Sequence, residues 1–289
     1  MMGTRTAVLN PPVETPDVTV VVATRNRRDR LLETLSRHAA PVILVDNGSD
    51  DGGPDAVAAA FPHVMVVRLG ENRGAAARNV GVELARTPYV AFADDDSYWA
   101  PGSLRQAAKL MRSHDRTGLL AAQVLVGPEA RLDPVSAAMA ASPLGAPADG
   151  PGPSVLGFLA CAVVVRREAF LAVGGFEPVL HVYGEEALLA MDLATAGWRM
   201  SYAPALTVRH LPLPAGRDNR ARCRIEARNR VLTALLRRPP RVVARVTATA
   251  WRSDPGGVTD AVRLLPWALR HRRALPPAVE SAVSLLDVA

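Results

Sequence analysis

The chain has 289 residues, of which 49% are hydrophobic and 21% are charged. This composition excludes a disordered chain, a collagen-like repeat and a disulfide-stapled miniprotein, and the length suffices for one large domain with an appendage. The formal net charge of +6 indicates an anionic partner, such as a nucleotide phosphate, a nucleic acid or an anionic membrane, and does not choose among them.

Apolar runs alternate with helical patterns over the first 120 residues. Buried strands are predicted by four β-branched runs, at 18–23, 42–45, 64–67 and 89–93. Helices are predicted between them, at 27–38, 54–61 and 74–85. This alternation is typical of βαβ units and predicts an α/β fold with a Rossmann-like, mostly parallel sheet.

The rest of the chain gives weaker patterns. Residues 127–154 are rich in Pro, Gly and Ala, which predicts an irregular insertion or loop. Further elements are expected as a strand at 155–165, helices at 167–173 and 185–196, and short strands at 198–202 and 206–210. We therefore expect a flexible N-terminus at 1–16, a main domain at 17–215 and an Arg-rich helical region at 216–289.

The number of cysteines and the length of the apolar runs indicate the cellular compartment of the protein. Cys161 and Cys223 are too few for a disulfide framework, and residues 1–16 show no signal-peptide pattern. The longest apolar run, around 158–165, is far shorter than the roughly 20 residues that a membrane-spanning helix needs. The sequence therefore predicts a cytoplasmic protein.

The acidic triplet Asp94-Asp95-Asp96 follows the fourth apolar run, at the sheet edge where α/β sheets bind ligands. Asp94 and Asp96 point the same way in an extended segment, so that both can hold one divalent ion. Oxygen ligands suit Mg²⁺ or Mn²⁺, and His210 would add a nitrogen ligand that favours Mn²⁺. The alternatives are an acidic turn that caps the next helix and a structural histidine.

Two further groups could carry chemistry. Glu185 and Glu186 follow Gly184 at the start of a helix, where acids favour the helix dipole, and one of them could instead serve as a general base. Arg78 lies in a helix that could point at a nucleotide or at solvent. Neither a P-loop nor a G-x-G-x-x-G turn follows the first strand, which argues against a P-loop enzyme and a nicotinamide-binding domain.

Six segments, in order over roughly residues 18–238, resemble the motifs of inverting family 2 glycosyltransferases. The first four are 20–27 (VVVATRNR), 45–51 (VDNGSDD), 72–81 (NRGAAARNVG) and 92–96 (FADDD), the last being similar to that family's D-x-D metal motif. The others are 174–176 (GGF) followed by 184–186 (GEE), and the closing strands 197–210. Together these motifs are far more specific than any one of them.

This resemblance implies a GT-A fold and transfer of a sugar from a nucleotide-diphosphate donor to an acceptor hydroxyl. The residues expected to bind the nucleotide sugar are Thr24, Arg25, Asp46, Arg78, Asp94 and Asp95. Asp94, Asp96 and His210 are expected to hold the metal, Mn²⁺ or Mg²⁺, which offsets charge on the leaving diphosphate. Glu186 is expected to take the proton of the attacking hydroxyl, which gives inversion in one step.

The acid pair departs from the family pattern, which usually ends in Asp where this chain has Glu186. A side chain one methylene longer displaces the carboxylate, and a displacement of about 1 Å can lower the rate about a hundredfold. Glu186 stays the expected base, with Glu185 as the alternative. The departure also leaves open a protein that binds a nucleotide sugar or a partner without turnover.

A nucleotidyltransferase is the other enzyme class that could use such a sheet and such metal chemistry. It would need a phosphate loop rich in Gly and Lys after the first strand. The chain has Thr24-Arg25-Asn26-Arg27-Arg28 there, without Lys. A sugar transferase therefore stays the leading hypothesis.

Positive charge is concentrated in the last part of the chain. Residues 1–210 carry 19 basic and 22 acidic residues, whereas residues 211–289 carry 15 basic and 6 acidic residues. These Arg-rich helices could contact an anionic membrane, which would place the protein at the inner membrane face, or could form a homodimer interface or an appendage packed on the core. Nucleic acid is not expected, because aromatic stacking platforms are missing. The acceptor could be a glycan, a lipid-linked sugar or a small molecule.

Overall fold

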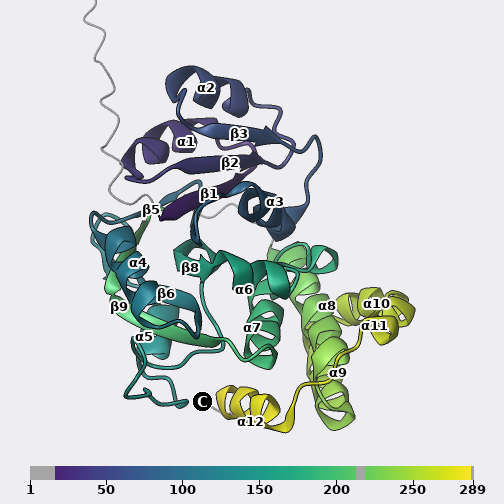
Figure 1. Ribbon diagram of the computed structural model, residues 1–289. Helices are drawn as coiled ribbons and strands as arrows, with labels where there is room; N and C mark the ends of the chain where they lie inside the picture. Colours follow the sequence, from purple (N-terminus) through teal and green to yellow (C-terminus); the bar gives the residue numbers. More distant parts are fainter. Residues whose placement is uncertain (1–16, 213–218, 288–289) are drawn as a thin grey trace, which may run out of the picture.

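The computed structural model describes residues 17–212 and 219–287, and its strands form one curled sheet (Figure 1). The expected flexible N-terminus at 1–16 lies outside the described residues. The first half of the sheet is parallel, with the order β3-β2-β1-β4, and consists of β1 (Val18–Thr24), β2 (Val42–Asp46), β3 (Met65–Arg68) and β4 (Tyr89–Asp94). The expected α/β fold is confirmed, and these strands lie where the apolar runs predict them.

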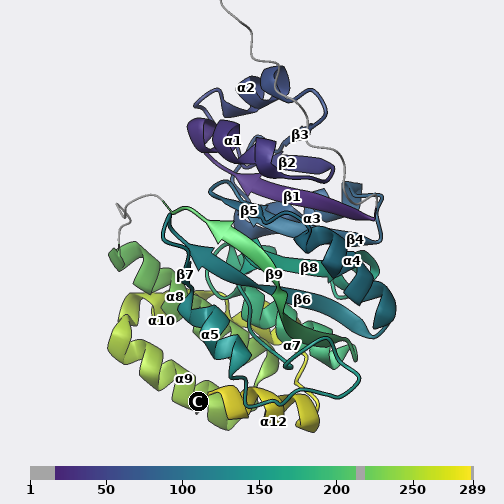
Figure 2. The ribbon, with the colours of Figure 1, turned by 90° about the vertical axis from the view of Figure 1, so that its left-hand side faces the viewer.

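The second half of the sheet is mixed. It contains β8 (Val163–Arg166), β6 (Thr117–Val126), β9 (Arg199–His210), β5 (Ser97–Trp99) and β7 (Arg131–Leu132). Strands β6 and β9 run side by side in parallel (Figure 2), while β8 joins β4 to β6 in antiparallel pairing. Strand β5 pairs antiparallel with the end of β9, which brings the acidic triplet next to His210.

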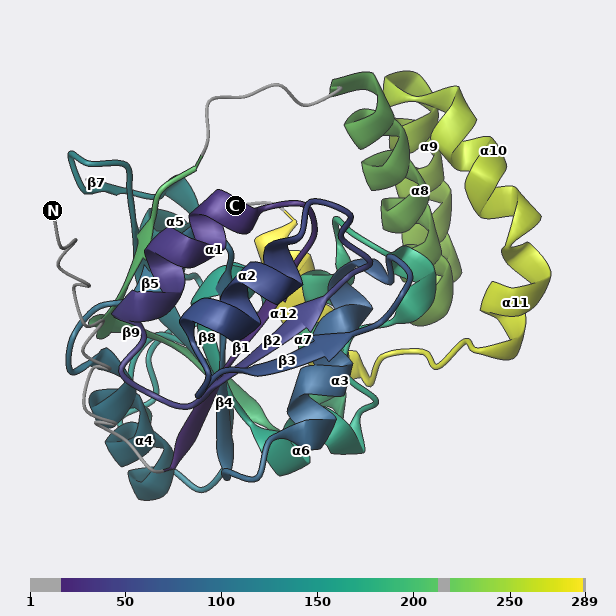
Figure 3. The ribbon, with the colours of Figure 1, turned by 90° about the horizontal axis from the view of Figure 1, so that it is seen from above.

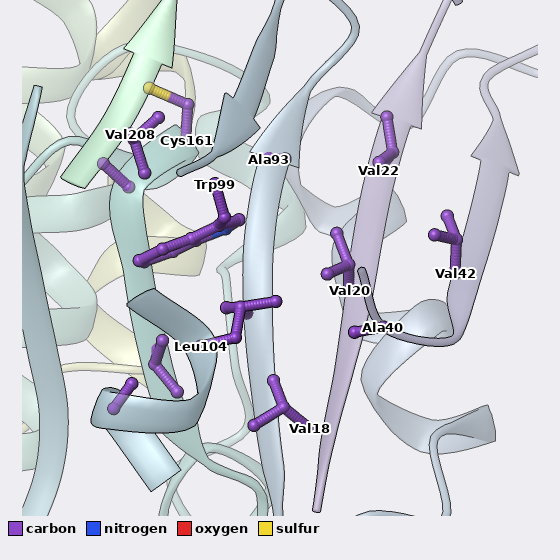
Figure 4. Packing of buried hydrophobic residues seen from close by; sticks show 14 of the residues in the cluster. Val18, Val20, Val22, Ala40, Val42, Ala93, Trp99, Leu104, Cys161 and Val208 are labelled. Atoms are coloured by element: carbon purple, nitrogen blue, oxygen red, sulfur yellow. The ribbon is translucent and has the colours of Figure 1, made fainter. Parts of the chain in front are cut away.

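Helices cover both faces of the sheet because β1 is apolar on both sides. Val18, Val20 and Val22 belong to one core cluster (Figure 4), and Val21 belongs to the other. The first cluster is closed by α1 (Arg28–Thr34), α2 (Gly53–Ala60) and α4 (Ser103–Ser113). The second is closed by α3 (Ala77–Leu84), α6 (Arg167–Ala172) and α7 (Glu185–Thr195). This two-sided burial explains why β1 has an unbroken apolar sequence.

The C-terminal helices are α8 (Asn219–Arg237), α9 (Pro240–Ser253), α10 (Pro255–Arg263), α11 (Leu265–Arg270) and α12 (Pro277–Leu286). Among them, α8 and α12 pack against α7, and α9, α10 and α11 pack against α8, with which they form one group (Figure 3). Leu180 and Leu188 of the main domain are buried in the same apolar cluster as Leu232 of α8. Arg237 pairs with Asp192 of α7 through two hydrogen bonds, of 2.5 and 2.9 Å.

Part of the C-terminal basic charge is therefore structural. Arg237 and Arg238 are 8% and 5% exposed, and Arg238 pairs with Glu280 and Asp287 of the last helical segment. These two guanidinium groups tie α8 to α7 and to α12 and its C-terminal end. Among the described helices, none combines the length and the apolar character that crossing a membrane requires.

Three sequence-based expectations need correction. The segment 127–154 is not wholly irregular, because it holds β7 and the helix α5 (Pro134–Ala140), whose first turn is capped by Asp133 through a 2.8 Å bond from the Val135 N–H. The expected strand at 155–165 is limited to β8, since a 3₁₀ turn at Ala160–Ala162 precedes it. The two short strands at 198–202 and 206–210 are one strand, β9.

Pro204 explains the interruption within β9. The register of β9 against β6 shifts between the pairs Ala122–Ala203 and Gln123–Thr207, so that extra residues of β9 bulge out. Proline has no N–H to donate to a ladder and is tolerated in strands at such bulges. The sequence gap therefore marks an irregularity within one strand and not a break between two.

Candidate active site

Polar residues meet where β1, β2 and β4 end. The register pairs Thr24 with Asp46, and Ala23 with Asp94, so that these strand ends lie next to one another at one edge of the sheet. The sequence predicted the acidic triplet at this edge, and the strand register places Thr24 and Asp46 beside it. The carboxyl edge of a parallel sheet is where α/β proteins place their ligands.

A cavity of about 900 Å³ opens at this edge and continues between α7 and α8. The expected site residues that line it are Thr24, Arg25, Arg78, Asp94, Asp95, Glu185, Glu186 and His210. Asp46 and Asp96 are not among the lining residues. Most of the expected site is thus brought together around one space, with the aspartates on the sheet side and the glutamates at the start of α7.

Asp46 is occupied by the backbone of its own loop. It is 3% exposed, and both of its carboxylate oxygens accept the Ser49 N–H, at 3.1 and 3.2 Å. The neighbouring Asn47 accepts the Arg73 N–H at 3.0 Å and donates to the Gly74 carbonyl at 3.1 Å. These two residues shape the floor of the cavity by fixing the loops that follow β2 and β3.

The acidic triplet is held by three different partners. Asp94 forms an ion pair with Arg78 of α3, a residue that is 9% exposed. Asp95 accepts a 3.0 Å hydrogen bond from the Thr24 hydroxyl. Burial, together with the charges of Asp94 and Asp96, raises the pKa of Asp95 to about 7. The triplet is therefore built into the end of the sheet, but it is not the extended segment that was expected, because Asp95 and Asp96 form the turn between β4 and β5.

Asp96 lies against His210, the last residue of β9. Oδ1 of Asp96 is 3.3 Å from Nε2 of His210, and the hydrogen bond that this carboxylate accepts raises the pKa of the histidine. In the described part of the chain no three His, Cys, Asp or Glu side chains are gathered closely enough to hold a metal ion as they stand. Two carboxylates and an imidazole near one strand end are nevertheless a donor set that suits Mn²⁺.

The two glutamates stand at the N-terminus of α7, after Gly184, whose φ of 100° is left-handed. Glu185 is 5% exposed, and its Oε2 atom has no hydrogen-bond partner, whereas Glu186 is half-buried. Burial raises the pKa of both carboxyl groups, and the charge of Arg78 partly opposes this rise. A carboxylate that holds its proton more tightly than usual is suited to proton transfer near neutral pH.

A turn connects α3 to the segment that carries the glutamates. Asn79 donates to the Phe176 carbonyl at 2.8 Å and accepts the Phe176 N–H at 2.9 Å. The Phe176 ring is fully buried against Phe92 and Phe170, with ring centroids 5.7 and 5.5 Å away. At Gly175, which has a φ of 69°, a Cβ atom would lie 2.6 Å from Oδ1 of Asn79, so the turn requires glycine.

The position of Arg228-Asn229-Arg230 in the chain suggests that they face the cleft, and the structure places Asn229 and Arg230 in the cavity wall, together with residues that the sequence did not assign. The lining residues in α8 are Glu226, Asn229, Arg230, Thr233 and Ala234, and Arg238 lines the cavity just after the helix ends. Within an Arg-rich helix, these residues gave no pattern that separates a cavity wall from a solvated face. The burial of Asn229, whose amide needs hydrogen-bond partners, is visible only in the fold.

Comparison with known proteins agrees with the motifs. The family model Glycosyl transferase family 2 matches residues 19–173. The chain is 28% identical over 240 residues to an N-acetylglucosaminyl-diphospho-decaprenol L-rhamnosyltransferase of Mycobacterium tuberculosis, covering 68% of this chain and 75% of that protein. It is 32% identical over 203 residues to the pre-mycofactocin glycosyltransferase of the same species, covering 67% of this chain and 42% of that protein.

Solved structures share the fold. The mannosyltransferase PcManGT from Pyrobaculum calidifontis, in complex with GDP-Man and Mn²⁺, has a TM-score of 0.58 at 22% identity, covering 96% of this chain and 77% of that one. The S. aureus TarS 1–349 complex with UDP-GlcNAc also has a TM-score of 0.58, at 18% identity, covering 92% and 83% of the two chains. Since the family model spans more than half of the sequence, the chain belongs to glycosyl transferase family 2.

Proposed function

We propose that this protein transfers a sugar from a nucleotide-diphosphate sugar to an acceptor hydroxyl, with inversion, in a single metal-assisted displacement. One observation carries the proposal: a single cavity has Asp94 and Asp95 on its sheet side and Glu185 and Glu186 on its α7 side. A donor bound at the sheet edge therefore presents its reacting carbon to a carboxylate across the cavity.

The donor lies against the strand ends. Thr24 and Arg25 line the cavity at the end of β1, and Arg78 offers a buried cation for the diphosphate. The Nε atom of Arg78 is buried without a partner, so this side chain retains an unused donor. Asp46 contributes through Ser49, by holding the loop against which the base and ribose rest.

A divalent cation, Mn²⁺ or Mg²⁺, would be held by Asp94, Asp96 and His210. Their carboxylate oxygens and imidazole nitrogen are the donor types that Mn²⁺ accepts, and the PcManGT complex contains this ion. When bound, the ion supplies Lewis-acid stabilisation of the leaving diphosphate. Arg78 adds a fixed positive charge on the same side of the cavity.

Glu186 is the base in this scheme. It is more exposed to the cavity than Glu185, and its raised pKa makes its carboxylate an effective proton acceptor near neutral pH. It takes the proton of the acceptor hydroxyl while the hydroxyl oxygen bonds to C1 of the sugar. The bond from C1 to the diphosphate breaks on the opposite side, so that the configuration at C1 inverts.

The acceptor enters along α8. Beyond Glu186 the cavity continues past Arg230 and Thr233 to Val246 of α9. The similar M. tuberculosis rhamnosyltransferase is named for N-acetylglucosaminyl-diphospho-decaprenol, so polyprenyl-diphosphate-linked sugars belong among the acceptors to be tested. The exposed arginines of the C-terminal helices would favour an anionic membrane that presents such acceptors.

The test is a turnover assay with Mn²⁺ and a panel of nucleotide sugars and hydroxyl acceptors. Release of nucleoside diphosphate, with a product of inverted anomeric configuration by NMR, is the expected result. In a parallel assay with nucleoside triphosphates and sugar 1-phosphates, release of pyrophosphate would show a nucleotidyltransferase. Binding of nucleotide without product, for every donor and acceptor pair, would show a binding protein and overturn the proposal.

A further inference from the structure

The segment before the glutamates has a strained backbone. His181 and Tyr183 have φ angles of 64° and 68°, and Gly184 follows with 100°. Left-handed conformations are strained in non-glycine residues and persist only where surrounding groups impose them. The segment 181–184 leads directly into Glu185 and Glu186, so whatever imposes its shape also determines where the two carboxylates stand.

Asn229 of α8 is the group that holds this segment. Its side chain is 1% exposed, and Nδ2 lies 2.8 Å from the Leu180 carbonyl oxygen, 2.8 Å from that of Val182 and 2.6 Å from that of Tyr183. An amide nitrogen has two N–H groups, so three carbonyls share two donors. One side chain from α8 thereby contacts three of the four carbonyl oxygens of residues 180–183.

The orientation of the amide is fixed by its neighbour. Nε of Arg228 donates to Oδ1 of Asn229 at 2.9 Å, which leaves Nδ2 to face the carbonyls. Nη2 of Arg228 also donates to the Leu180 carbonyl at 2.9 Å. Because an arginine has no acceptor atom, the reverse orientation of the Asn229 amide would place two donors against each other.

The turn that leads into α3, on the side of the cavity where the nucleotide sugar would bind, holds the same segment from the opposite direction. The Ala75 N–H donates to the His181 carbonyl at 2.6 Å. A Cβ atom at Gly74 would lie 2.1 Å from that oxygen, so the contact requires glycine. The segment 181–184 is therefore clamped between the turn that leads into α3 and the amide on α8.

We infer that Asn229 is a positioning residue for the transfer: it fixes the backbone of residues 180–183 and, through it, the place of the base carboxylate. The inference rests on the proposed function, since it concerns the geometry of proton removal. It also gives the C-terminal helices a role in the reaction, because α8 supplies the group that completes the site on the sheet.

Two variants test the inference. Asn229→Asp keeps the volume and replaces the donor nitrogen by an oxygen that repels the three carbonyls, and Asn229→Ala removes the group. Asn219→Ala is the matched control, because Asn219 is exposed at the start of the same helix. Hydrogen exchange of the backbone is measured first, since it reports on the segment without any turnover.

In Asn229→Asp and Asn229→Ala we expect faster backbone exchange confined to residues 180–186, with exchange in α8 unchanged. We also expect kcat to fall by about tenfold to a hundredfold, as for a misplaced catalytic group. The KM for the donor, and the affinity for UDP or GDP with Mn²⁺, should change less than twofold. Asn219→Ala should match the wild type in every measurement.

The readouts separate two kinds of failure. Unchanged exchange at 180–186, or a fall in nucleotide affinity that parallels the fall in kcat, would overturn the positioning role. Unchanged kcat in a folded Asn229→Asp variant would overturn it as well. If the wild type itself gives no transfer product, the proposed function fails, and with it the positioning role, even where the exchange data show that Asn229 clamps the segment.

Discussion

Arg78 and Asp94 form an ion pair at the centre of the site, where a guanidinium that is 9% exposed stands among carboxylates from two parts of the chain. The positive charge of Arg78 also lowers the pKa of Glu185 and of Glu186, in opposition to their burial. One side chain of α3 is therefore coupled both to the aspartates at the sheet edge and to the acids of α7.

Replacing Arg78 should change the pH dependence as well as the rate. Without the cation in Arg78→Gln, only backbone hydrogen bonds still oppose the effect of burial on the pKa of Glu185 and Glu186, so the acid limb of the pH–rate profile should move to higher pH. Turnover near neutral pH should fall by at least about tenfold, since a charge that stabilises the leaving group is lost. Arg78→Lys retains the charge and should leave the acid limb in place. An unchanged limb in Arg78→Gln would contradict this coupling.

The wild type should gain activity as pH rises through neutrality. A base must be ionised, and burial raises the pKa of Glu185 to about 7 and that of Glu186 in the same direction. Turnover should therefore increase between pH 5.5 and 8, in a pH–rate profile recorded at saturating donor. A profile that is already flat above pH 5.5 would exclude either glutamate as the base in its buried state.

Stability should follow the opposite trend over the same window. Between the ordinary carboxyl pKa of 4.5 and about 7, folded Glu185 keeps a proton that the unfolded chain has lost. Folding then binds protons, so these groups make the free energy of unfolding fall as pH rises through the window. Urea midpoints of the wild type and of Glu185→Gln, recorded from pH 4.5 to 8, should converge at the acid end. Parallel curves would contradict the raised pKa.

The identity of the base is decided by comparing two isosteric variants. Glu186→Gln should lower kcat by more than about a hundredfold, since general-base catalysis contributes factors of this size. Glu185→Gln should retain most of the turnover and shift the acid limb, because the charges of the two groups interact. Full turnover in Glu186→Gln, with loss in Glu185→Gln, would assign the base to Glu185.

Replacing a metal ligand should weaken the binding of Mn²⁺, so that more Mn²⁺ is needed for turnover. His210 lies 3.3 Å from Asp96 at the point where β5 pairs with β9. His210→Ala and Asp96→Asn should each raise the Mn²⁺ concentration for half-maximal turnover by about tenfold or more. Removal of metal by EDTA should abolish wild-type turnover, and added Mn²⁺ should restore it. Full activity in EDTA would contradict a metal-assisted mechanism.

The sequence predicted the strands that carry the site because their signals are local. Val18–Thr24 and Tyr89–Asp94 are apolar runs with polar ends, and the ends coincide with the cavity. It did not predict β6, the ten-residue strand at the centre of the second half, since Leu and Ala in its sequence do not separate a strand from a helix.

The role of α8 was beyond sequence reasoning for a different reason. The contacts of Asn229 with Leu180, Val182 and Tyr183 join residues 46 to 49 positions apart, and no periodicity carries such a pairing. Likewise, the Asp46 carboxylate was expected to bind the nucleotide sugar. Only the fold shows that it instead accepts the Ser49 N–H and does not line the cavity.

The packing of α3 against β1 should be disrupted by a single added methyl group. An ideal Cβ at Gly81 would lie 2.4 Å from Cγ1 of Val21 and 3.2 Å from Cγ2 of Val45, both within the core beneath the helix. Gly81→Ala gains about 1 kcal/mol of helix propensity, but overpacking costs typically about 1–3 kcal/mol. We expect a net loss of stability, with a lower urea midpoint at an unchanged slope. Gly157→Ala, where a Cβ meets nothing within 4 Å, should leave the midpoint unchanged.

The same substitution should reach the active site, because α3 carries Arg78 as well as Gly81. A helix pushed away from Val21 displaces the guanidinium from Asp94, so the affinity for UDP or GDP with Mn²⁺ should fall in Gly81→Ala under conditions where the protein is fully folded. Gly157→Ala should retain the wild-type affinity. A Gly81→Ala protein of wild-type stability and affinity would show that β1 yields to the added methyl, and that the close approach of α3 is not what holds Arg78 in place.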